Sequence, residues 1–294
     1  MKQKFKDPLI PRKKKITDNV QLIDEKIPLP SVIEISESGM CNRTCSFCPR
    51  SAPDYPHKNE FISDDLIKKI SSELSKFHFK GIFLFSGFVE PMLDKNIFNL
   101  IKIVRKNLPL CKIEMVTNGD VLNDTRTLKL FESGLSTLLI SIYDGKKEAD
   151  NMKKMLDKAG IAETKYKIRH RYLSENDSFG ITLSNRSGMM ENAEYKIKAL
   201  SEPLKKPCYY PHYTFFMDYN GDVLVCSHDW GKKLIVGSLV KEKFIDIWLG
   251  KKFQFARKKL LEGNRKFSPC NLCDVDGELM GFEHAKIWNS SYKN

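Results

Sequence analysis

Apolar and polar positions between residues 31 and 190 alternate between two patterns. Short apolar runs predict buried strands, and each is followed by a stretch in which apolar residues recur at helical spacing. The expected strands cover residues 31–35, 81–85, 112–117, 138–141 and 166–172. The expected helices are one capped by Ser63 and three over residues 97–107, 124–133 and 146–159. This alternation predicts an α/β fold whose parallel strands are joined by right-handed crossovers.

The pattern changes in the last third of the chain. Two apolar runs, 213–218 and 222–226, flank Asn220 and Gly221, and this arrangement is typical of a β-hairpin. A further helix is expected over 253–261. We interpret this region as a small unit that does not continue the first fold. The expected parts are an irregular, proline-rich N-terminal arm over residues 1–30, an α/β domain over 31–200 and a C-terminal unit over 201–294.

Composition limits the classes of function. The 294 residues carry a net charge of +12, but the lysines are scattered, so we expect a solvated surface and no nucleic-acid-binding face. An anionic substrate is a minor alternative. No apolar run approaches the roughly 20 residues of a membrane span, and no apolar segment follows the basic N-terminus as in a secretory signal. Eight cysteines without such a signal favour a cytoplasmic location and metal binding over disulfides.

Three cysteines, Cys41, Cys45 and Cys48, follow the first expected strand at the spacing C-x3-C-x2-C. Three thiolates can bind three irons of a [4Fe–4S] cluster and leave the fourth iron open. An open coordination position is typical of a catalytic metal. The alternatives are a zinc site with His57 as fourth ligand, a disulfide pair, or three unrelated thiols.

This cysteine run resembles the cluster loop of the radical S-adenosylmethionine (SAM) superfamily. The resemblance implies a partial (β/α)6 barrel of the TIM type, with reactive loops at the carboxyl ends of its strands. It also implies that the open iron chelates the amino and carboxylate groups of SAM, whose reductive cleavage yields a 5′-deoxyadenosyl radical. In the family, the aromatic residue at the position of Phe47 packs near the adenine.

A second segment, Ser86-Gly87-Phe88-Val89-Glu90-Pro91, follows the second expected strand and resembles the family's GGEP-type motif. The resemblance implies that Gly87 and Glu90 contact the SAM ammonium, where a carboxylate favours a cation. Val89 replaces the common glycine of this motif. The alternative is a turn at the barrel rim in which Glu90 only caps a helix.

The next strand ends carry further candidates for cofactor binding. Thr117 and Asn118 end the third strand and Ser141 ends the fourth, where the family contacts the ribose and carboxylate of SAM. Arg169 and Arg171 lie on the fifth strand, and a guanidinium can bind a carboxylate through two hydrogen bonds. We favour Arg171, which lies nearer the carboxyl end. The alternative for Thr117 and Asn118 is an ordinary turn, and the alternative for Ser141 is a buried hydroxyl bonded to the backbone. For the two arginines the alternative is a solvated strand face.

The polar loop 184–188 resembles the N-R-[AG]-G segment of radical SAM proteins that carry an auxiliary domain. The resemblance implies that Asn185 and Arg186 face the substrate and contribute hydrogen bonds or proton transfer. The alternative is a plain exposed turn.

Four more cysteines, Cys208, Cys226, Cys270 and Cys273, suit either zinc or a fully ligated [4Fe–4S] cluster. Their arrangement resembles the twitch domain, the shortened relative of the SPASM domain, and their spacing is similar to that of twitch enzymes that oxidise a sugar-like alcohol. The resemblance implies one auxiliary [4Fe–4S] cluster. Cys111 is expected to be a small core residue.

Together these features predict a radical SAM oxidoreductase with two [4Fe–4S] clusters. We expect it to oxidise a hydroxylated small molecule, such as a sugar, aminocyclitol or nucleotide-sugar, with the auxiliary cluster as electron acceptor. Flavodoxin or ferredoxin is the expected type of electron donor. One alternative is radical modification of a peptide or protein side chain. Another is a non-enzymatic interaction module that binds zinc through both cysteine sets.

Overall fold

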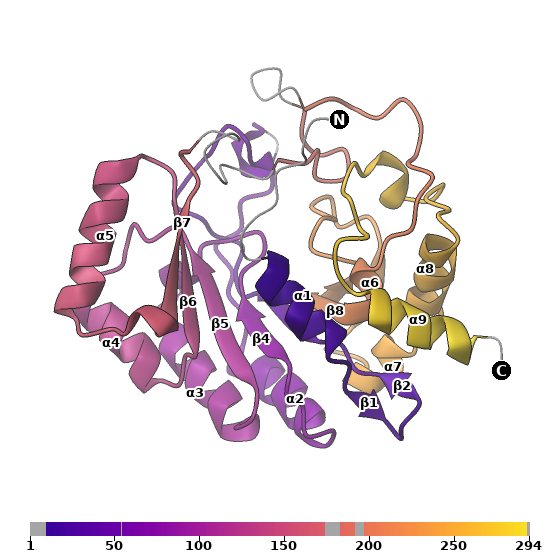
Figure 1. The fold of residues 1–294 in the computed structure, drawn as a ribbon, viewed down its shortest axis with the longest axis horizontal. Helices are drawn as coiled ribbons and strands as arrows, with labels where there is room; N and C mark the ends of the chain where they lie inside the picture. The colour runs from indigo at the N-terminus through magenta and orange to yellow at the C-terminus, as the bar shows by residue number, and fades with distance from the viewer. Residues whose placement is uncertain (1–9, 54, 174–182, 192–196, 293–294) are drawn as a thin grey trace.

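The fold is built on one twisted sheet with helices on both sides. The computed structural model describes residues 10–53, 55–173, 183–191 and 197–292. Among these, eight strands form the sheet in the order β10-β9-β8-β3-β4-β5-β6-β7 (Figure 1). The parallel strands that follow chain order are β3 (Val32–Ser36), β4 (Ile82–Phe85), β5 (Lys112–Thr117), β6 (Thr137–Ile142) and β7 (Tyr166–His170).

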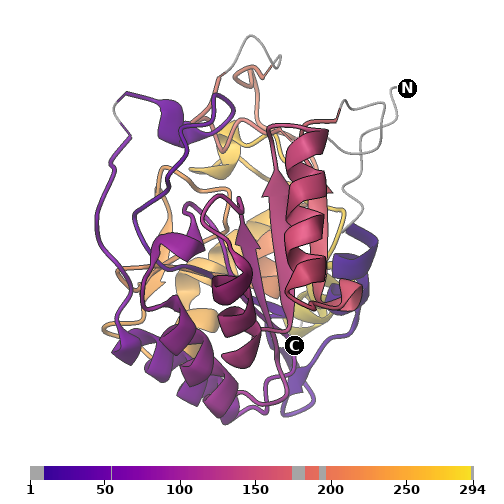
Figure 2. The same ribbon diagram turned by 90° about the vertical axis from the view of Figure 1, so that its left-hand side faces the viewer.

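The crossover helices cover the outer face of these strands, as Figure 2 shows for the half of the sheet nearest the viewer. They are α2 (Asp64–Ser75), α3 (Ile97–Asn107), α4 (Asp124–Glu132) and α5 (Lys146–Lys158). Ser63 caps α2, because its hydroxyl accepts a hydrogen bond of 3.2 Å from the Leu66 backbone N–H. The expected α/β alternation is therefore confirmed, and Cys111 lies in the core as expected.

The C-terminal hairpin extends the barrel sheet. β8 (Thr214–Asp218) pairs in parallel with β3, so that Phe215 lies beside Ile33, and β9 (Asp222–Leu224) returns antiparallel to β8. The interpretation of this region as a unit that does not continue the barrel was therefore wrong. The physical reason is that β3 would otherwise present an unpaired edge, and the buried face of β8 joins the same core. The residue bounds of the three expected parts stay a prediction.

Part of the N-terminal arm is regular, contrary to the prediction of an irregular segment. Residues Ile10–Asp18 form α1, and the chain then makes a two-stranded hairpin of β1 (Leu22–Ile23) and β2 (Ile27–Pro28). Arg12 of α1 forms an ion pair with Glu114 of β5, which is 2% exposed. The sequence did not reveal this helix, because the partner of Arg12 lies about a hundred positions further along the chain.

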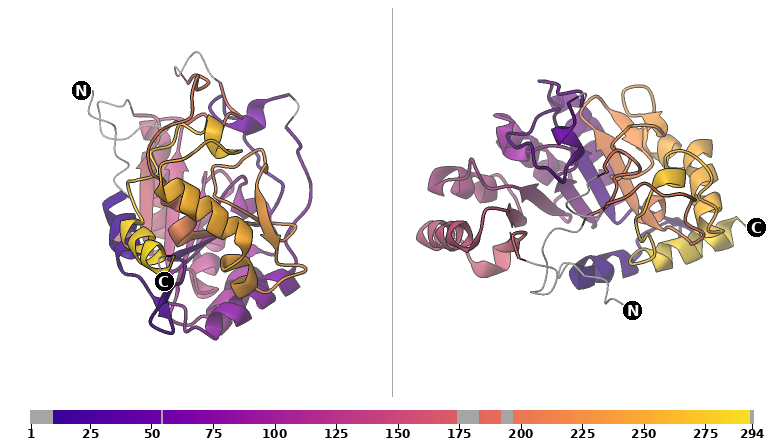
Figure 3. Two further views of the ribbon diagram at one scale, coloured as in Figure 1. Left: turned by 90° about the vertical axis from the view of Figure 1, so that its right-hand side faces the viewer. Right: turned by 90° about the horizontal axis from the view of Figure 1, so that it is seen from above.

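The C-terminal region adds further helices. They are α6 (Tyr210–Tyr213), α7 (Phe244–Trp248), α8 (Lys251–Leu261) and α9 (Phe282–Ser291), with β10 (Ile235–Ser238) at the sheet edge. The first three contact β8 or β10, and the last contacts α6 and α8. The helix expected over 253–261 is therefore confirmed within α8. α9 also contacts α1, and the two lie side by side in Figure 3. In the part of the chain that the structure describes, we find no helix long and apolar enough to span a bilayer.

Candidate active site

A cavity of about 820 Å³ runs along the inside of the barrel. Its wall includes Val32 and Ile82, which begin β3 and β4, and Tyr143 and Arg171, which follow β6 and β7. The cavity therefore extends from one end of the parallel strands to the other. Every residue expected to bind SAM lines it, as do the first three cysteines and Arg186, whereas Asn185 does not.

The loop after β3 holds three free thiols at this cavity. Cys41, Cys45 and Cys48 are half-buried, and the Cys48 N–H donates to the Cys45 carbonyl at 2.9 Å. Burial raises the pKa of all three thiols, and the neighbouring Cys48 and Cys41 help raise the pKa of Cys45 to about 11. Such a set is stable as thiolates only beside a cationic core. The three residues therefore fit an iron–sulfur cluster.

Arg43 ties this loop to the ends of two other strands. Its guanidinium donates to Asp120 at 2.7 Å, beyond β5, and to Asp144 at 3.0 Å, beyond β6. Asn42 also donates to Asp120, at 2.7 Å. These bonds, chiefly the one to Asp120, raise the pKa of Arg43, and Arg43 lowers the pKa of Asp144. The sequence analysis missed Arg43, whose only signal was its position between two cysteines.

A second arginine joins the cysteine loop to the segment after β4. Arg50 is 3% exposed and donates to the carbonyl oxygens of Phe88 and Gly39, each at 2.9 Å. It also lies 3.0 Å from Nδ1 of His57, which the zinc alternative required as a ligand. Sequence reasoning missed Arg50 as well. Its two backbone contacts fix the loop with respect to the GGEP-like segment.

Glu90 organises the rim of the cavity. Its carboxylate accepts hydrogen bonds from the Thr117 hydroxyl at 2.6 Å, the Asn118 backbone N–H at 2.7 Å and the Met92 backbone N–H at 3.0 Å. Burial raises the pKa of this carboxyl, and the bonds from Asn118 and Thr117 oppose that rise. The alternative role of Glu90, as a helix cap, is thus confirmed by its bond from the Met92 N–H. A carboxylate has about four acceptor positions, which leaves one for a ligand.

The wall near Phe47 includes a tyrosine that sequence analysis missed. The ring centroids of Phe47 and Tyr143 are 5.4 Å apart, and Tyr143 lies two positions after Ser141, which also lines the cavity. That period of two was the available signal. Arg169 donates to the Ser141 hydroxyl at 3.3 Å. Gly87, which also lines the cavity, adopts φ +99°, and a Cβ there would approach Ser36 to 2.9 Å.

In the loop 184–188, which was expected to face the substrate, Asn185 and Arg186 lie in different surroundings. Asn185 is fully buried; its backbone N–H donates to Asp274 at 3.0 Å and its side-chain amide donates to the Leu272 carbonyl at 2.7 Å. Asn185 does not line the cavity, because its amide is bound to the segment between the last two cysteines, and its expected contact with the substrate stays a prediction. Arg186 does line the cavity, and its backbone has φ +49°. Its buried Nε has no hydrogen-bond partner among the described residues.

The other four cysteines lie together around a small second cavity. These residues are Cys208, Cys226, Cys270 and Cys273. Burial raises the pKa of each thiol, and neighbouring cysteines raise it further for Cys208, Cys226 and Cys270. Arg265, which is 1% exposed, donates to the carbonyl oxygens of Pro207 and Val275, each at 2.8 Å, and so fixes the chain beside this set. Four close thiols beside a buried cation fit a fully ligated cluster.

The two cavities share part of a wall. Three residues line both cavities, namely Tyr210, His228 and Val275. The ring centroids of Tyr210 and His228 are 5.0 Å apart, in an edge-to-face arrangement. Burial lowers the pKa of His228 to about 3, so its ring is neutral near pH 7. Among the described residues, no three His, Cys, Asp or Glu side chains lie close enough to share a single metal ion. In a [4Fe–4S] cluster each thiolate binds its own iron, so such sharing is not required.

Comparison with protein families agrees with this geometry. Residues 35–183 match the radical SAM superfamily, and residues 208–274 match SPASM, an iron–sulfur cluster-binding domain. The chain belongs to the radical SAM superfamily. It is an oxidoreductase that uses SAM and two [4Fe–4S] clusters, and it acts on a small molecule. The alternative of a non-enzymatic zinc-binding module is therefore wrong.

Two individual proteins are similar to this chain in sequence. The chain is 29% identical over 245 residues to an S-adenosyl-L-methionine-dependent 2-deoxy-scyllo-inosamine dehydrogenase from Niallia circulans, covering 83% of this chain and 92% of the relative. A GTP 3′,8-cyclase from Clostridium perfringens is 30% identical over 111 residues, or 37% of this chain and 33% of the cyclase.

Two solved structures resemble this chain in fold. The crystal structure of BtrN in complex with AdoMet and 2-DOIA has a TM-score of 0.73 and 28% identity, covering 87% of this chain and 97% of BtrN. Native anSMEcpe with bound AdoMet, at a TM-score of 0.52 and 14% identity, covers 88% of this chain and 96% of its own. The second likeness concerns the fold alone.

Proposed function

We propose that this enzyme oxidises a secondary alcohol of a compact, hydroxylated small molecule, with an aminocyclitol as the leading substrate class. The observation that carries the proposal is a single cavity that joins the three-cysteine loop to a polar interior and shares a wall with the second cysteine set. The dehydrogenase from Niallia circulans and the structure of BtrN with 2-DOIA support the substrate class.

The first group of residues would bind the SAM-cleaving cluster and SAM. When bound, these supply a 5′-deoxyadenosyl radical that removes a hydrogen atom from the substrate carbon. Cys41, Cys45 and Cys48 would bind three of the irons. The residues that would surround SAM are Phe47, Gly87, Glu90, Thr117, Asn118, Ser141 and Arg171. Arg186, whose Nε has no hydrogen-bond partner within the described part of the chain, would contact either the SAM carboxylate or the substrate.

The second group would complete the oxidation. Conversion of an alcohol carbon to a carbonyl requires the loss of one hydrogen atom, one proton and one electron. Cys208, Cys226, Cys270 and Cys273 would hold the cluster that takes the electron. Tyr210 and His228 line both cavities, so the electron would cross the wall that they form.

This chemistry indicates which protein partner and which environment the enzyme needs. Reductive cleavage of SAM needs a one-electron donor, for which we propose flavodoxin or ferredoxin in a reducing cytoplasm. The net charge of +12 would favour an anionic protein partner. We also propose the working division of the chain into residues 1–30, 31–200 and 201–294, with β8 shared between the last two parts.

Anaerobic turnover tests the proposal. Reconstituted enzyme would receive SAM, a reductant and, separately, an aminocyclitol, a sugar, a nucleotide-sugar and short peptides. We expect 5′-deoxyadenosine and a ketone to form in equal amounts with the aminocyclitol. Formation of 5′-deoxyadenosine coupled to a modified peptide, with no small-molecule oxidation, would establish the alternative of peptide modification instead.

A further inference from the structure

The N-terminal helix α1 forms part of the cavity wall. Three of its residues line the cavity and are at least partly shielded from solvent, namely Lys13, Ile16 and Thr17. Their spacing is that of one face of a helix, and the opposite face, with Lys14 and Lys15, is exposed. The roles described so far use none of these three side chains.

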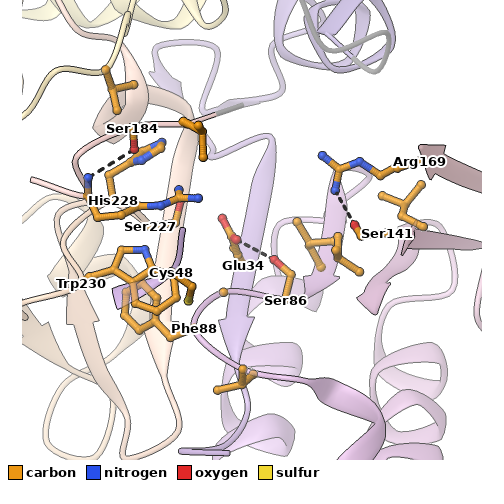
Figure 4. A pocket seen from close by; sticks show the side chains of 18 of the residues that line it. Glu34, Cys48, Ser86, Phe88, Ser141, Arg169, Ser184, Ser227, His228 and Trp230 are labelled. Atoms are coloured by element: carbon orange, nitrogen blue, oxygen red, sulfur yellow. Dashed lines mark hydrogen bonds between the residues drawn. The ribbon is translucent and has the colours of Figure 1, made fainter. Parts of the chain in front are cut away.

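The first turn of α1 lies level with the middle of the parallel strands. Figure 4 shows the hydrogen bond of 2.7 Å from Ser86 to Glu34 of β3 near the middle of the cavity. The strand register places Glu114 of β5 level with Glu34, and Glu114 forms the ion pair with Arg12. Burial raises the pKa of Glu34, and Lys13, the next residue of α1, opposes that rise. Two neighbouring residues of α1 thus reach the middle of the cavity.

The last turn of α1 lies at the amino end of the strands, where α9 meets it. The Ser31 hydroxyl, directly before β3, donates to the Ile16 carbonyl at 3.4 Å and lies 3.1 Å from Nε2 of His284 on α9. Both helices lie outside the ranges 35–183 and 208–274 that match the two families. α1 and α9 are therefore additional to the parts that the family models cover.

The volume of the cavity limits the size of the substrate. A pocket for one drug-sized ligand usually has about 300–1,000 Å³. The cavity of about 820 Å³ must hold SAM beside the cysteine loop as well as the substrate. The remaining space suits one compact ring, and α1 occupies the region at the amino ends of the strands into which a longer substrate would extend.

We propose that α1 forms the floor of the substrate site, and that Lys13, Ile16 and Thr17 restrict the substrate to a single ring. This inference rests on the proposed function and deepens it, because it separates aminocyclitols and simple sugars from glycosides and nucleotide-sugars. A floor at this depth also holds the ring toward the cysteine loop, where the hydrogen atom is removed.

The test compares an aminocyclitol with its glycoside, in which the same ring carries one further sugar. For wild-type enzyme we expect kcat/KM to favour the aminocyclitol by roughly tenfold to a hundredfold, because a group that does not fit forces packed segments to move. The double variant Lys13→Ala and Ile16→Ala opens the floor and should shift this ratio roughly tenfold toward the glycoside. The matched control, Lys14→Ala with Lys15→Ala, changes the exposed face of the same helix and should leave the ratio unchanged.

Further readouts separate the floor from a purely structural role. Iron content and substrate-independent SAM cleavage should be the same in both double variants as in wild type. If the first double variant does not fold, Ile16→Phe provides the test, because its larger ring narrows the site and should lower kcat/KM for the aminocyclitol roughly tenfold with SAM cleavage unchanged.

Three results would overturn the role of α1 alone. These are equal kcat/KM for the two compounds in wild type, a wild-type ratio in the folded Lys13→Ala and Ile16→Ala variant, and unchanged turnover in Ile16→Phe. A wild-type enzyme that oxidises neither compound would overturn the proposed function, and this inference with it.

Discussion

Individual side chains shape the site mainly by holding backbone segments together. Glu90 joins the segment after β4 to the end of β5, and Arg50 joins the cysteine loop to the same segment. Both are almost fully buried, so their hydrogen bonds are shielded from water. Removing one partner of such a bond leaves a buried polar group unsatisfied. Substitutions here are therefore expected to change both stability and cofactor binding.

Glu90→Gln tests this at the level of one residue. The amide replaces a carboxylate oxygen by an NH2 group, which cannot accept a hydrogen bond from Asn118 or Thr117. We expect SAM affinity to fall by about 1–3 kcal/mol and the melting temperature to fall as well. Calorimetric titration and thermal unfolding measure the two effects. Glu132→Gln, at an exposed site on α4, is the control, and unchanged SAM affinity in Glu90→Gln would contradict the role of this carboxylate.

At the level of elements, the site depends on how loops from different strands are held in register. The cysteine loop follows β3, yet Arg43 anchors it beyond β5 and β6. The same loop reaches the segment after β4 through Arg50. All these contacts lie at the carboxyl ends of parallel strands, which meet at one edge of the sheet. These arginine contacts position the loop without involving the cysteine side chains.

Arg43→Lys tests this anchoring. Lysine keeps the positive charge but cannot form the forked contacts of a guanidinium with Asp120 and Asp144. We expect the first cluster to lose iron to a chelator roughly tenfold faster, because the loop no longer holds the thiols in place. Arg105→Lys breaks a comparable set of backbone bonds at the end of α3 and should lower the melting temperature without changing this rate. Equal rates in wild type and Arg43→Lys would remove the anchoring role.

At the scale of the whole molecule, the two cysteine sets are held by one continuous sheet. β3 precedes the first set, and its neighbour β8 leads through the hairpin to Cys226 of the second set. The N-terminal helix α1 closes the inside of the barrel and contacts α9 from the far end of the chain. The position of each cysteine set therefore depends on residues that are remote in sequence.

The triple variant Cys41→Ala, Cys45→Ala and Cys48→Ala separates the two sets. It should still bind about four irons per chain, against about eight in wild type, and should form no 5′-deoxyadenosine under reducing anaerobic conditions. Its remaining cluster should give a reducible cubane signal. Cys111→Ala, which removes a buried core thiol, should keep about eight irons. Zinc in the triple variant, or retained SAM cleavage, would contradict the assignment of the two sets.

The sequence by itself determined the features that depend on local order. Strand and helix periods fixed α3 over Ile97–Asn107 and β5 over Lys112–Thr117, because each element buries one side against a sheet formed by its neighbours in the chain. The Asn220-Gly221 turn fixed the hairpin in the same way. The cysteine spacings predicted two sets of thiols, and the structure places the first set at the large cavity and the second around the small one.

Tertiary structure alone decided where distant segments meet. β8 pairs with β3 because a free strand edge in the barrel needs a partner, and no local pattern names that partner. α1 is stabilised through an ion pair between Arg12 and the remote Glu114. The sequence also did not reveal the orientation of polar side chains. Asn185 lies toward the second cysteine set, while Glu34 faces the cavity. Which polar side chain meets a ligand depends on packing among many segments, and this is information that a one-dimensional pattern does not contain.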